Sequence, residues 1–254
     1  MTTPIFFVHV MKTGGTTVFR YLRENFALDE LYPYRPLDIR FDGDEVDLTH
    51  HLRVPYLAGL SAERRRRIRV YTGHFPFVAT ELLGGDFVTV TLLRDPVERT
   101  ISLLRQLTRG TPWLDPSDRP PIPLPLEEVY EHPAVFEPLI HDHQTKVFSM
   151  ETSDQPDTYR DVISVDQARL AIARRNLEAV DVLGLTERYD EFLDRLEART
   201  AWHMPRGLQK NAAPIDDAAP VSERFRRRIA DDNAIDVELY EHAKALLGRR
   251  ALAP

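Results

Sequence analysis

The segment that decides the fold class lies near the start of the chain and reads Ile5-Phe6-Phe7-Val8-His9-Val10-Met11-Lys12-Thr13-Gly14-Gly15-Thr16-Thr17. Residues 4–10 form a continuous apolar run, which is typical of a strand buried on both faces of a parallel sheet. A turn follows over residues 12–17, and the apolar spacing after it predicts a helix from Thr16 to about residue 26. This order of strand, turn and helix predicts an α/β fold with a phosphate site at the turn.

Strands and helices alternate along the rest of the 254 residues. Apolar runs predict further strands at 68–72, 87–93 and 180–185. Helical periodicity predicts helices at 77–83, 96–108, 134–149, 166–178, 187–199, 221–231 and 234–247. The alternation favours βαβ units and a central parallel sheet flanked by helices, in a single domain covering residues 1–254.

Three segments lack clear periodicity. Residues 27–60 and 110–125 are rich in proline or in polar and aromatic residues, and we expect insertions or loops that shape a substrate pocket. Residues 203–220 are expected to form a third loop.

The composition is that of a globular protein, with 43% hydrophobic and 29% charged residues. The net charge of −7 argues against a bulk attraction to nucleic acid or anionic membrane, so an anionic ligand must be met by local positive groups. Cysteine is absent, which excludes disulfides and thiolate catalysis and fits a cytoplasmic location. We expect neither a transmembrane span nor a signal peptide, since the chain has no apolar run of about 18 residues.

The turn has the groups that bind a phosphate. Its glycines let backbone N–H groups approach an anion, and the following helix adds its free N–H groups and dipole. Thr16 and Thr17 add hydroxyl donors, and Lys12 adds a point charge. In the Walker A motif of nucleotide hydrolases the lysine follows the glycines, whereas Lys12 precedes them. The order therefore indicates a related cradle without the Mg²⁺ arrangement of those enzymes.

Two segments together resemble a known family. Lys12-Thr13-Gly14-Gly15-Thr16-Thr17 resembles the 5′-phosphosulfate loop of sulfotransferases that use 3′-phosphoadenosine 5′-phosphosulfate (PAPS), with Met11 replacing the usual proline. Leu93-Arg94-Asp95-Pro96-Val97-Glu98-Arg99-Thr100-Ile101-Ser102 resembles the family's 3′-phosphate motif, in which an arginine at a strand end and a serine eight residues later bind the phosphate. The match is closest to the carbohydrate-type branch that includes the heparan sulfate sulfotransferases and their bacterial relatives. Shorter matches are Gln144-Thr145-Lys146, residues 182–193 and Lys210-Asn211.

The resemblance implies a P-loop NTPase-like sulfotransferase fold. It also implies transfer of a sulfuryl group from PAPS to a hydroxyl of a carbohydrate or other small-molecule acceptor, with release of 3′-phosphoadenosine 5′-phosphate (PAP) and no metal. The implied donor-binding residues are Lys12, Thr13, Gly14, Gly15, Thr16, Thr17, Arg94 and Ser102, with Lys210 reaching the 3′-phosphate from a late loop. We assign Lys12 to the bridging oxygen and the departing 5′-phosphate.

His74 is the residue that we choose as the catalytic base. It directly follows a predicted strand, and the loops at the carboxyl ends of parallel strands face the ligand crevice. The unperturbed histidine pKa of about 6.5 suits proton abstraction near neutral pH. The family also uses a histidine in a comparable Gly-His segment. Glu24 is the alternative, since some relatives use a glutamate on the first helix.

Other notable residues have simpler interpretations. His9 alternates with apolar residues in the first strand and is expected to be a core histidine. His141 and His143 are not expected to bind a metal, because residues two apart on a helix do not share a face. The basic run 64–67 is expected to be a solvated helix face neutralised by nearby acids, with recognition of an anionic acceptor as the alternative.

Two other functions are compatible with parts of the pattern. A phosphotransferase with an unusual P-loop would need a Mg²⁺-binding acid after a strand; Asp95 is available, but Arg94 and Ser102 would then be unexplained. A non-catalytic PAP- or nucleotide-binding module would leave Lys12 and His74 without a purpose. No pattern identifies the acceptor or an oligomeric state.

Overall fold

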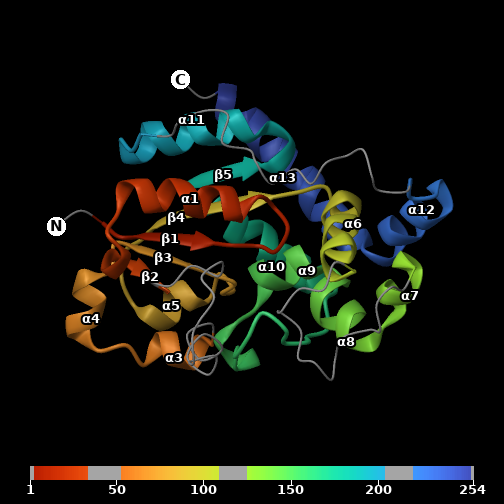
Figure 1. Cartoon of the computed structure of the whole chain (residues 1–254), viewed down its shortest axis with the longest axis horizontal. Helices are drawn as coiled ribbons and strands as arrows, with labels where there is room; N and C mark the ends of the chain where they lie inside the picture. Colours follow the sequence, from red (N-terminus) through yellow and green to blue (C-terminus); the bar gives the residue numbers. More distant parts are fainter. Residues whose placement is uncertain (1–2, 34–52, 109–124, 204–219, 253–254) are drawn as a thin grey trace.

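The structure is a computed structural model that describes residues 3–33, 53–108, 125–203 and 220–252. Its centre is a parallel sheet with the strand order β2-β3-β1-β4-β5. The strands are β1 (Ile5–Val8), β2 (Leu31–Tyr32), β3 (Val70–Gly73), β4 (Val88–Leu93) and β5 (Val182–Leu185). Helices lie on both faces of this sheet (Figure 1). The predicted α/β class with a central parallel sheet is confirmed.

Helices connect and flank the strands. They are α1 (Gly15–Asn25), α3 (Val54–Ala58), α4 (Ala62–Arg67), α5 (Ala79–Leu83), α6 (Pro96–Leu107), α7 (Leu126–Glu131), α8 (Pro133–Val135), α9 (His143–Ser149), α10 (Gln167–Glu178), α11 (Tyr189–Thr200), α12 (Glu223–Asp232) and α13 (Ala234–Leu252). Shorter helical turns are η1 (Leu28–Glu30), η4 (Thr152–Asp154) and η5 (Thr186–Arg188), and η3 (Phe136–Ile140) is a π-helix. None of the helices in the described ranges combines the length and apolar character needed to cross a bilayer.

The central strand β1 supplies side chains to two separate cores. Phe6 and Val8 pack in a core with α5, α10 and α13, whereas Ile5 and Phe7 pack in a core with α1 and α11. Successive side chains of a strand point to opposite faces, so one uninterrupted apolar run fills both. A third core beside the sheet joins α6, α7, η3 and α12.

The structure corrects the sequence prediction in two places. The helix predicted over 134–149 is interrupted: α8 ends at Val135, the π-helix η3 ends at Ile140, and Asp142 has a left-handed φ of 41° before α9 begins. The segment 27–60, predicted as an insertion, contributes β2, which pairs with β3, and also α3. Residues 34–52, 109–124 and 204–219 lie outside the described residues, so the expected loops at 110–125 and 203–220 and the single-domain prediction stay predictions.

The carboxyl ends of β3, β1, β4 and β5 meet on one side of the sheet, since these strands are neighbours and parallel. We call this side the carboxyl edge. The chain leaves the four strands at this edge, at residues 9–14, His74, Arg94 and Thr186. In the strand order, β2 and β3 lie on one flank of β1, and β4 and β5 lie on the other. The chain builds the first flank after β1 and then crosses to the second. The strand β1 is therefore at the switch point, where open α/β sheets bind ligands.

Candidate active site

The segment between β1 and α1 is a tight turn held by its surroundings. Lys12 and Gly14 both have left-handed backbone conformations, with φ of 69° and 93°. For a non-glycine residue such as Lys12 this conformation costs about 1–2 kcal/mol. Hydrogen bonds of Thr13 offset that cost: its Oγ1 donates to the Val10 carbonyl at 2.9 Å, and its own carbonyl accepts from Thr186 Oγ1 at 2.8 Å. The turn is therefore fixed in shape by a residue that follows β5 as well as by one that follows β1.

Gly15 begins α1 directly against the imidazole of His9. A Cβ at position 15 would lie 2.0 Å from His9 Nε2, so a side chain does not fit there without displacing the ring. The His9 ring also stacks on Phe7 and lies 4.3 Å from the His74 ring, centroid to centroid. Burial, together with His74 and Lys12, keeps the pKa of His9 well below its usual value. His9 packs as a neutral ring, and it lies between the turn and the proposed base.

The first turn of α1 is enclosed by α11. Thr17 is buried, and its N–H donates to the Gly14 carbonyl at 3.0 Å. The hydroxyl of Tyr189 donates to the same carbonyl at 3.4 Å, and a Cβ at Gly14 would lie 3.0 Å from the Tyr189 ring. The backbone of Thr16 lies in this turn, but its side chain is outside the described residues.

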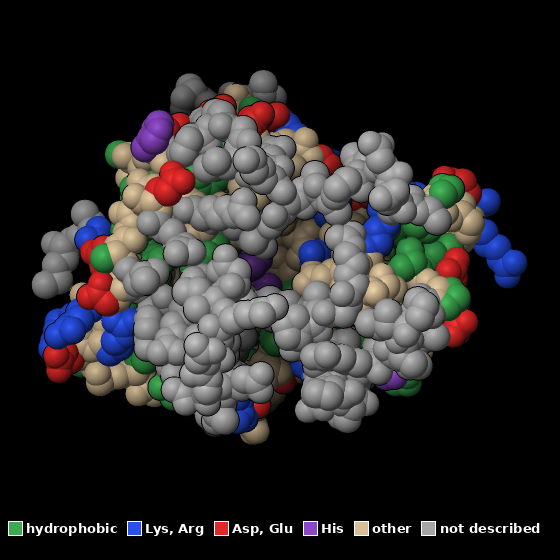
Figure 2. All heavy atoms as spheres, viewed as in Figure 1, with side chains coloured by type: hydrophobic (Ala, Val, Ile, Leu, Met, Phe, Trp, Pro, Cys, Tyr) green, Lys and Arg blue, Asp and Glu red, His purple; other side chains and the backbone are tan. Residues whose placement is uncertain are grey.

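Lys12 and Arg94 come together at the carboxyl edge. The Arg94 guanidinium donates through Nη1 to the Lys12 carbonyl at 3.2 Å. Lys12 Nζ donates to Gln106 Oε1 on α6 at 2.5 Å. Ser102 is one helical turn before Gln106 and half-buried, so it lies on the same face of α6 as the partner of Lys12. The residues predicted for the two ends of the donor are thus brought to one region. Figure 2 shows histidine and Lys or Arg side chains in a recess near the centre of one face of the molecule.

Arg94 carries a buried polar atom that needs a partner. Its Nε is buried and has no hydrogen-bond partner among the described residues. Leaving such a donor unsatisfied costs about 1–3 kcal/mol, and more for a charged group. A bound anion would satisfy it, so the arginine fits a phosphate of the predicted donor.

His74 has the tautomer of a base. Its Nδ1 lies 2.8 Å from the His9 carbonyl oxygen, which can only accept, so Nδ1 carries the proton and Nε2 has the free electron pair. Burial lowers the pKa of His74 to about 4, opposed by the hydrogen bond to His9 and assisted by the charge of Lys12. The ring is therefore neutral at pH 7 and able to accept a proton at Nε2.

The remaining sequence candidates lie elsewhere. Glu24 is exposed in the last turn of α1, nine residues from Gly15, which places it about 13 Å along the helix from the phosphate turn. This separation favours His74 over Glu24. Lys210 lies outside the described residues. His141 and His143 do not share one helix, because His141 follows the last residue of η3 and His143 begins α9. Among the described residues no group of three or more metal-ligating side chains is placed to hold a metal ion.

The basic run lies away from the carboxyl edge. The helix α4 leads into the amino end of β3, on the opposite side of the sheet. The predicted neutralisation by acids holds for Arg67, which pairs with Glu63 at 3.1 Å. Arg64 donates to the carbonyls of Asp29 and Leu31, and Arg65 donates to those of Ala58, Leu60 and Leu83. These two arginines join chain segments together.

Sequence reasoning missed Gln106, Thr186 and Tyr189. Thr186 directly follows β5, and its hydroxyl contacts both the Thr13 carbonyl at 2.8 Å and the Leu93 carbonyl at 3.2 Å. Its position after a strand was a usable signal, since such residues reach the carboxyl edge. Gln106 was also accessible to reasoning, because it lies four residues after Ser102 on one helix.

No protein-family model matches the chain. Heparan-sulfate 6-O-sulfotransferase 1 of Homo sapiens is 28% identical over 272 residues, which cover 97% of this chain and 66% of that protein. Over 97% of its length the chain is thus similar to a heparan-sulfate sulfotransferase. Heparan-sulfate 6-O-sulfotransferase 1 of Mus musculus is 27% identical over 272 residues, which cover 97% of this chain and 66% of that protein. Heparan-sulfate 6-O-sulfotransferase 2 of Homo sapiens is 27% identical over 286 residues, which cover 97% of this chain and 45% of that protein. The chain thus spans slightly less than two thirds of the first two relatives and under half of the third.

Proposed function

We propose that this protein transfers the sulfuryl group of PAPS to a hydroxyl group of a carbohydrate acceptor and releases PAP. The observation that carries the proposal is the contact between Arg94 Nη1 and the Lys12 carbonyl at 3.2 Å. It joins the residue assigned to the 3′-phosphate to the loop assigned to the 5′-phosphosulfate. The homology to heparan-sulfate sulfotransferases over 97% of the chain supports the same reaction type.

In the proposed donor site, each charged group has one role. The backbone N–H groups and threonines of residues 13–17 hold the 5′-phosphosulfate at the N-terminus of α1. Arg94 and Ser102 bind the 3′-phosphate, which distinguishes PAPS from ATP, and Lys210, which lies outside the described residues, is proposed to contribute to the same phosphate. Lys12 Nζ leaves Gln106 and donates to the oxygen that bridges sulfur and phosphorus. Its charge stabilises the negative charge that develops there during transfer.

The proposed transfer is an in-line displacement at sulfur. His74 Nε2 accepts the proton of the acceptor hydroxyl while the oxygen of that hydroxyl forms its bond to sulfur. The bond between sulfur and the bridging oxygen breaks, and its electron pair stays on the phosphate of PAP beside Lys12. His74 ends the step as an imidazolium, and the His9 carbonyl keeps the ring in place through Nδ1.

The proposed acceptor is a glycan. The curated relatives are named for the 6-O position of heparan sulfate, and we extend only the class, a carbohydrate hydroxyl, to this chain. The cytoplasmic location expected from the absence of cysteine stays a prediction.

The test is a transfer assay with ³⁵S-labelled PAPS and a panel of glycans that includes heparosan and 6-O-desulfated heparin. We expect label in at least one glycan, with the same rate when EDTA is present. Transfer that requires Mg²⁺, or transfer of phosphate from ATP, would favour the phosphotransferase alternative. Absence of labelled product together with absence of PAP binding by calorimetry would refute the proposal, and PAP binding without product from any acceptor would favour a non-catalytic module.

A further inference from the structure

Gln144 makes a contact that the proposed reaction does not yet use. It is fully buried on α9, and its amide binds the main chain of Arg94 at both polar atoms. Gln144 Oε1 accepts from the Arg94 N–H at 3.1 Å, and Gln144 Nε2 donates to the Arg94 carbonyl at 2.8 Å. A side-chain amide presents a donor and an acceptor side by side, as a peptide group does. Gln144 therefore extends the hydrogen bonding of the sheet to the residue just beyond β4.

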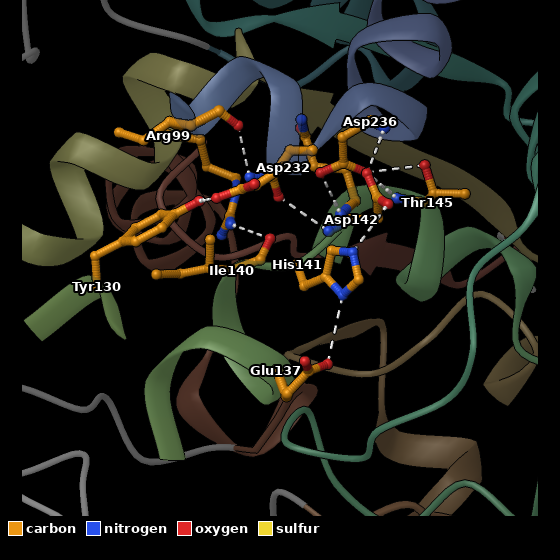
Figure 3. Close-up of polar contacts among 12 residues, drawn as sticks. Arg99, Tyr130, Glu137, Ile140, His141, Asp142, Thr145, Asp232 and Asp236 are labelled. Atoms are coloured by element: carbon orange, nitrogen blue, oxygen red, sulfur yellow. Dashed lines mark hydrogen bonds and ion pairs between the residues drawn. The ribbon is translucent and has the colours of Figure 1, made fainter. Parts of the chain in front are cut away.

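The helix that carries Gln144 is itself fixed by α13 (Figure 3). The carboxylate of Asp236 accepts from the N–H of Gln144 at 3.0 Å, the N–H of Thr145 at 2.7 Å and Thr145 Oγ1 at 2.8 Å. In return, Asp142 Oδ1 accepts from the Asp236 N–H at 2.8 Å. The two helices cap each other's first turns through buried side chains. This reciprocal cap fixes the position of Gln144.

The residue after Arg94, Asp95, is also held by α13, through a second set of hydrogen bonds. The Asp95 N–H donates to Glu187 Oε1 at 3.1 Å, and Glu187 Oε2 accepts from the Tyr240 hydroxyl of α13 at 2.8 Å. Two successive peptide groups after β4 are thus tied to α13, one through Gln144 and one through Glu187. The side chain of Arg94 is tied separately, by Nη1 to the Lys12 carbonyl.

We propose that Gln144 is a positioning residue for donor binding, which holds the main chain of Arg94 so that its guanidinium is aligned with the 3′-phosphate. The inference rests on the proposed function. An arginine gains most from a phosphate when two parallel N–H donors reach it together, and that geometry depends on where the main chain starts the side chain. The side-chain amide of Gln144 binds the main chain of Arg94. Loss of this amide therefore removes the alignment of the guanidinium and leaves its charge in place.

The test compares two nucleotides that differ in the 3′-phosphate. We measure the Kd of PAP and of adenosine 5′-phosphate by calorimetry for the wild type and for Gln144→Leu, which has a similar volume and no hydrogen-bonding groups. We expect Gln144→Leu to bind PAP about tenfold more weakly and adenosine 5′-phosphate within twofold of the wild type. The KM for PAPS is expected to rise more than kcat falls.

A double-mutant cycle assigns the effect to Arg94. In an Arg94→Ala background, Gln144→Leu is expected to cause no further loss of PAP affinity, because no guanidinium remains to be aligned. Asn176→Ala is the matched control: it removes another amide hydrogen bond, from Nδ2 to the Phe148 carbonyl at 2.8 Å, at the other end of α9. We expect it to lower the thermal stability and leave the Kd of PAP unchanged.

Several results would overturn the inference. These are equal losses for both nucleotides in Gln144→Leu, unchanged PAP affinity, or a full additional loss in the Arg94→Ala background. If Gln144→Leu does not fold, Gln144→Glu takes its place, since it keeps the acceptor but sets an oxygen against the Arg94 carbonyl, and the same selective loss is expected. A wild type that binds neither nucleotide refutes the proposed function itself and this inference with it.

Discussion

Gly15 shows at the scale of one residue how closely the phosphate turn and the proposed base constrain each other. A Cβ there would lie 2.0 Å from Nε2 of His9, whose ring is 4.3 Å from that of His74. The glycine is needed for a close approach between helix and ring, since its φ is not in the left-handed region. Any larger residue must move either α1 or the histidine pair.

Gly15→Ala is therefore expected to destabilise the fold by about 1–3 kcal/mol, the usual cost of overpacking, and to weaken PAP binding at least tenfold. The measurements are urea unfolding and calorimetry. Gly248→Ala in α13 is the control, because nothing lies within 4 Å of the new Cβ and alanine favours a helix. Adding His9→Ala to Gly15→Ala should restore part of the stability; additive losses in this double variant would contradict the packing argument.

The pH dependence of transfer tests the state of His74. Its pKa is lowered to about 4, so the ring is neutral and competent above that pH and protonated below it. We expect kcat/KM to stay constant from pH 7.5 down to pH 5, with folding checked by circular dichroism at each pH. An acid limb centred near 6.5 would contradict the assigned environment of His74.

His74→Ala provides the complementary measurement. Turnover is expected to fall at least a hundredfold, a typical contribution of a general base, with PAP affinity within a few-fold of the wild type. The exposed His203 serves as the control, and His203→Ala should retain normal turnover. Near-normal turnover of His74→Ala would remove this residue from the mechanism.

Residues next to strand ends were the ones that sequence reasoning placed well. Lys12, His74 and Arg94 each follow an apolar run, and parallel strands carry such residues to a common edge. The contacts that fix their orientation were not accessible in this way. The partner of Lys12 is on α6 and the partner of Arg94 is on α9, and no local spacing encodes a contact between residues 50 or more positions apart.

Elements held by distant side chains were the ones predicted poorly. The helix expected over 134–149 breaks because the end of η3 is bound by buried cations: Lys146 donates to the Pro138 carbonyl and Arg99 to the carbonyls of Leu139 and Ile140. Figure 3 shows Arg99 reaching Ile140 from α6. The strand β2 was missed for a different reason, since its two residues are too few to form an apolar run.

The cap of α9 gives a prediction at the scale of an element. Asp236→Ala leaves two N–H groups and the Thr145 hydroxyl without their acceptor and removes the carboxylate that offsets the buried charge of Arg99. We expect a loss of at least about 3 kcal/mol in the free energy of unfolding. Asp166→Ala, which removes the exposed cap of α10, should cost about 1 kcal/mol. Equal losses in urea unfolding would show that the buried cap has no special weight.

At the scale of the whole molecule, the three most deeply buried of the described histidines link stability to pH. Burial lowers the pKa values of His9, His74 and His143, so each is neutral when folded and takes up a proton near pH 6.5 when unfolded. Unfolding therefore binds protons, and the stability present above pH 6.5 is lost as the pH falls. Asp142, with a pKa raised to about 6, acts in the opposite direction at lower pH.

We expect the free energy of unfolding to fall by about 1 kcal/mol between pH 7.5 and pH 6.5, measured by urea denaturation. The three histidines act in the same direction across this range, which lies above the pKa of Asp142. A stability that is flat or rises toward pH 6.5 would mean that the three rings are not held neutral in the folded protein.

Gln144 and Glu187 hold Arg94 and Asp95, and both are themselves bound by α13. This dependence on α13 has a consequence while the protein is being synthesised. On a ribosome the phosphate turn is made before α13, because Asp236 and Tyr240 follow it by more than 200 residues. A nascent chain that already contains the turn, the strands and His74 still lacks the helix that fixes Arg94. We expect such a chain to bind PAP weakly until α13 has left the exit tunnel and docked.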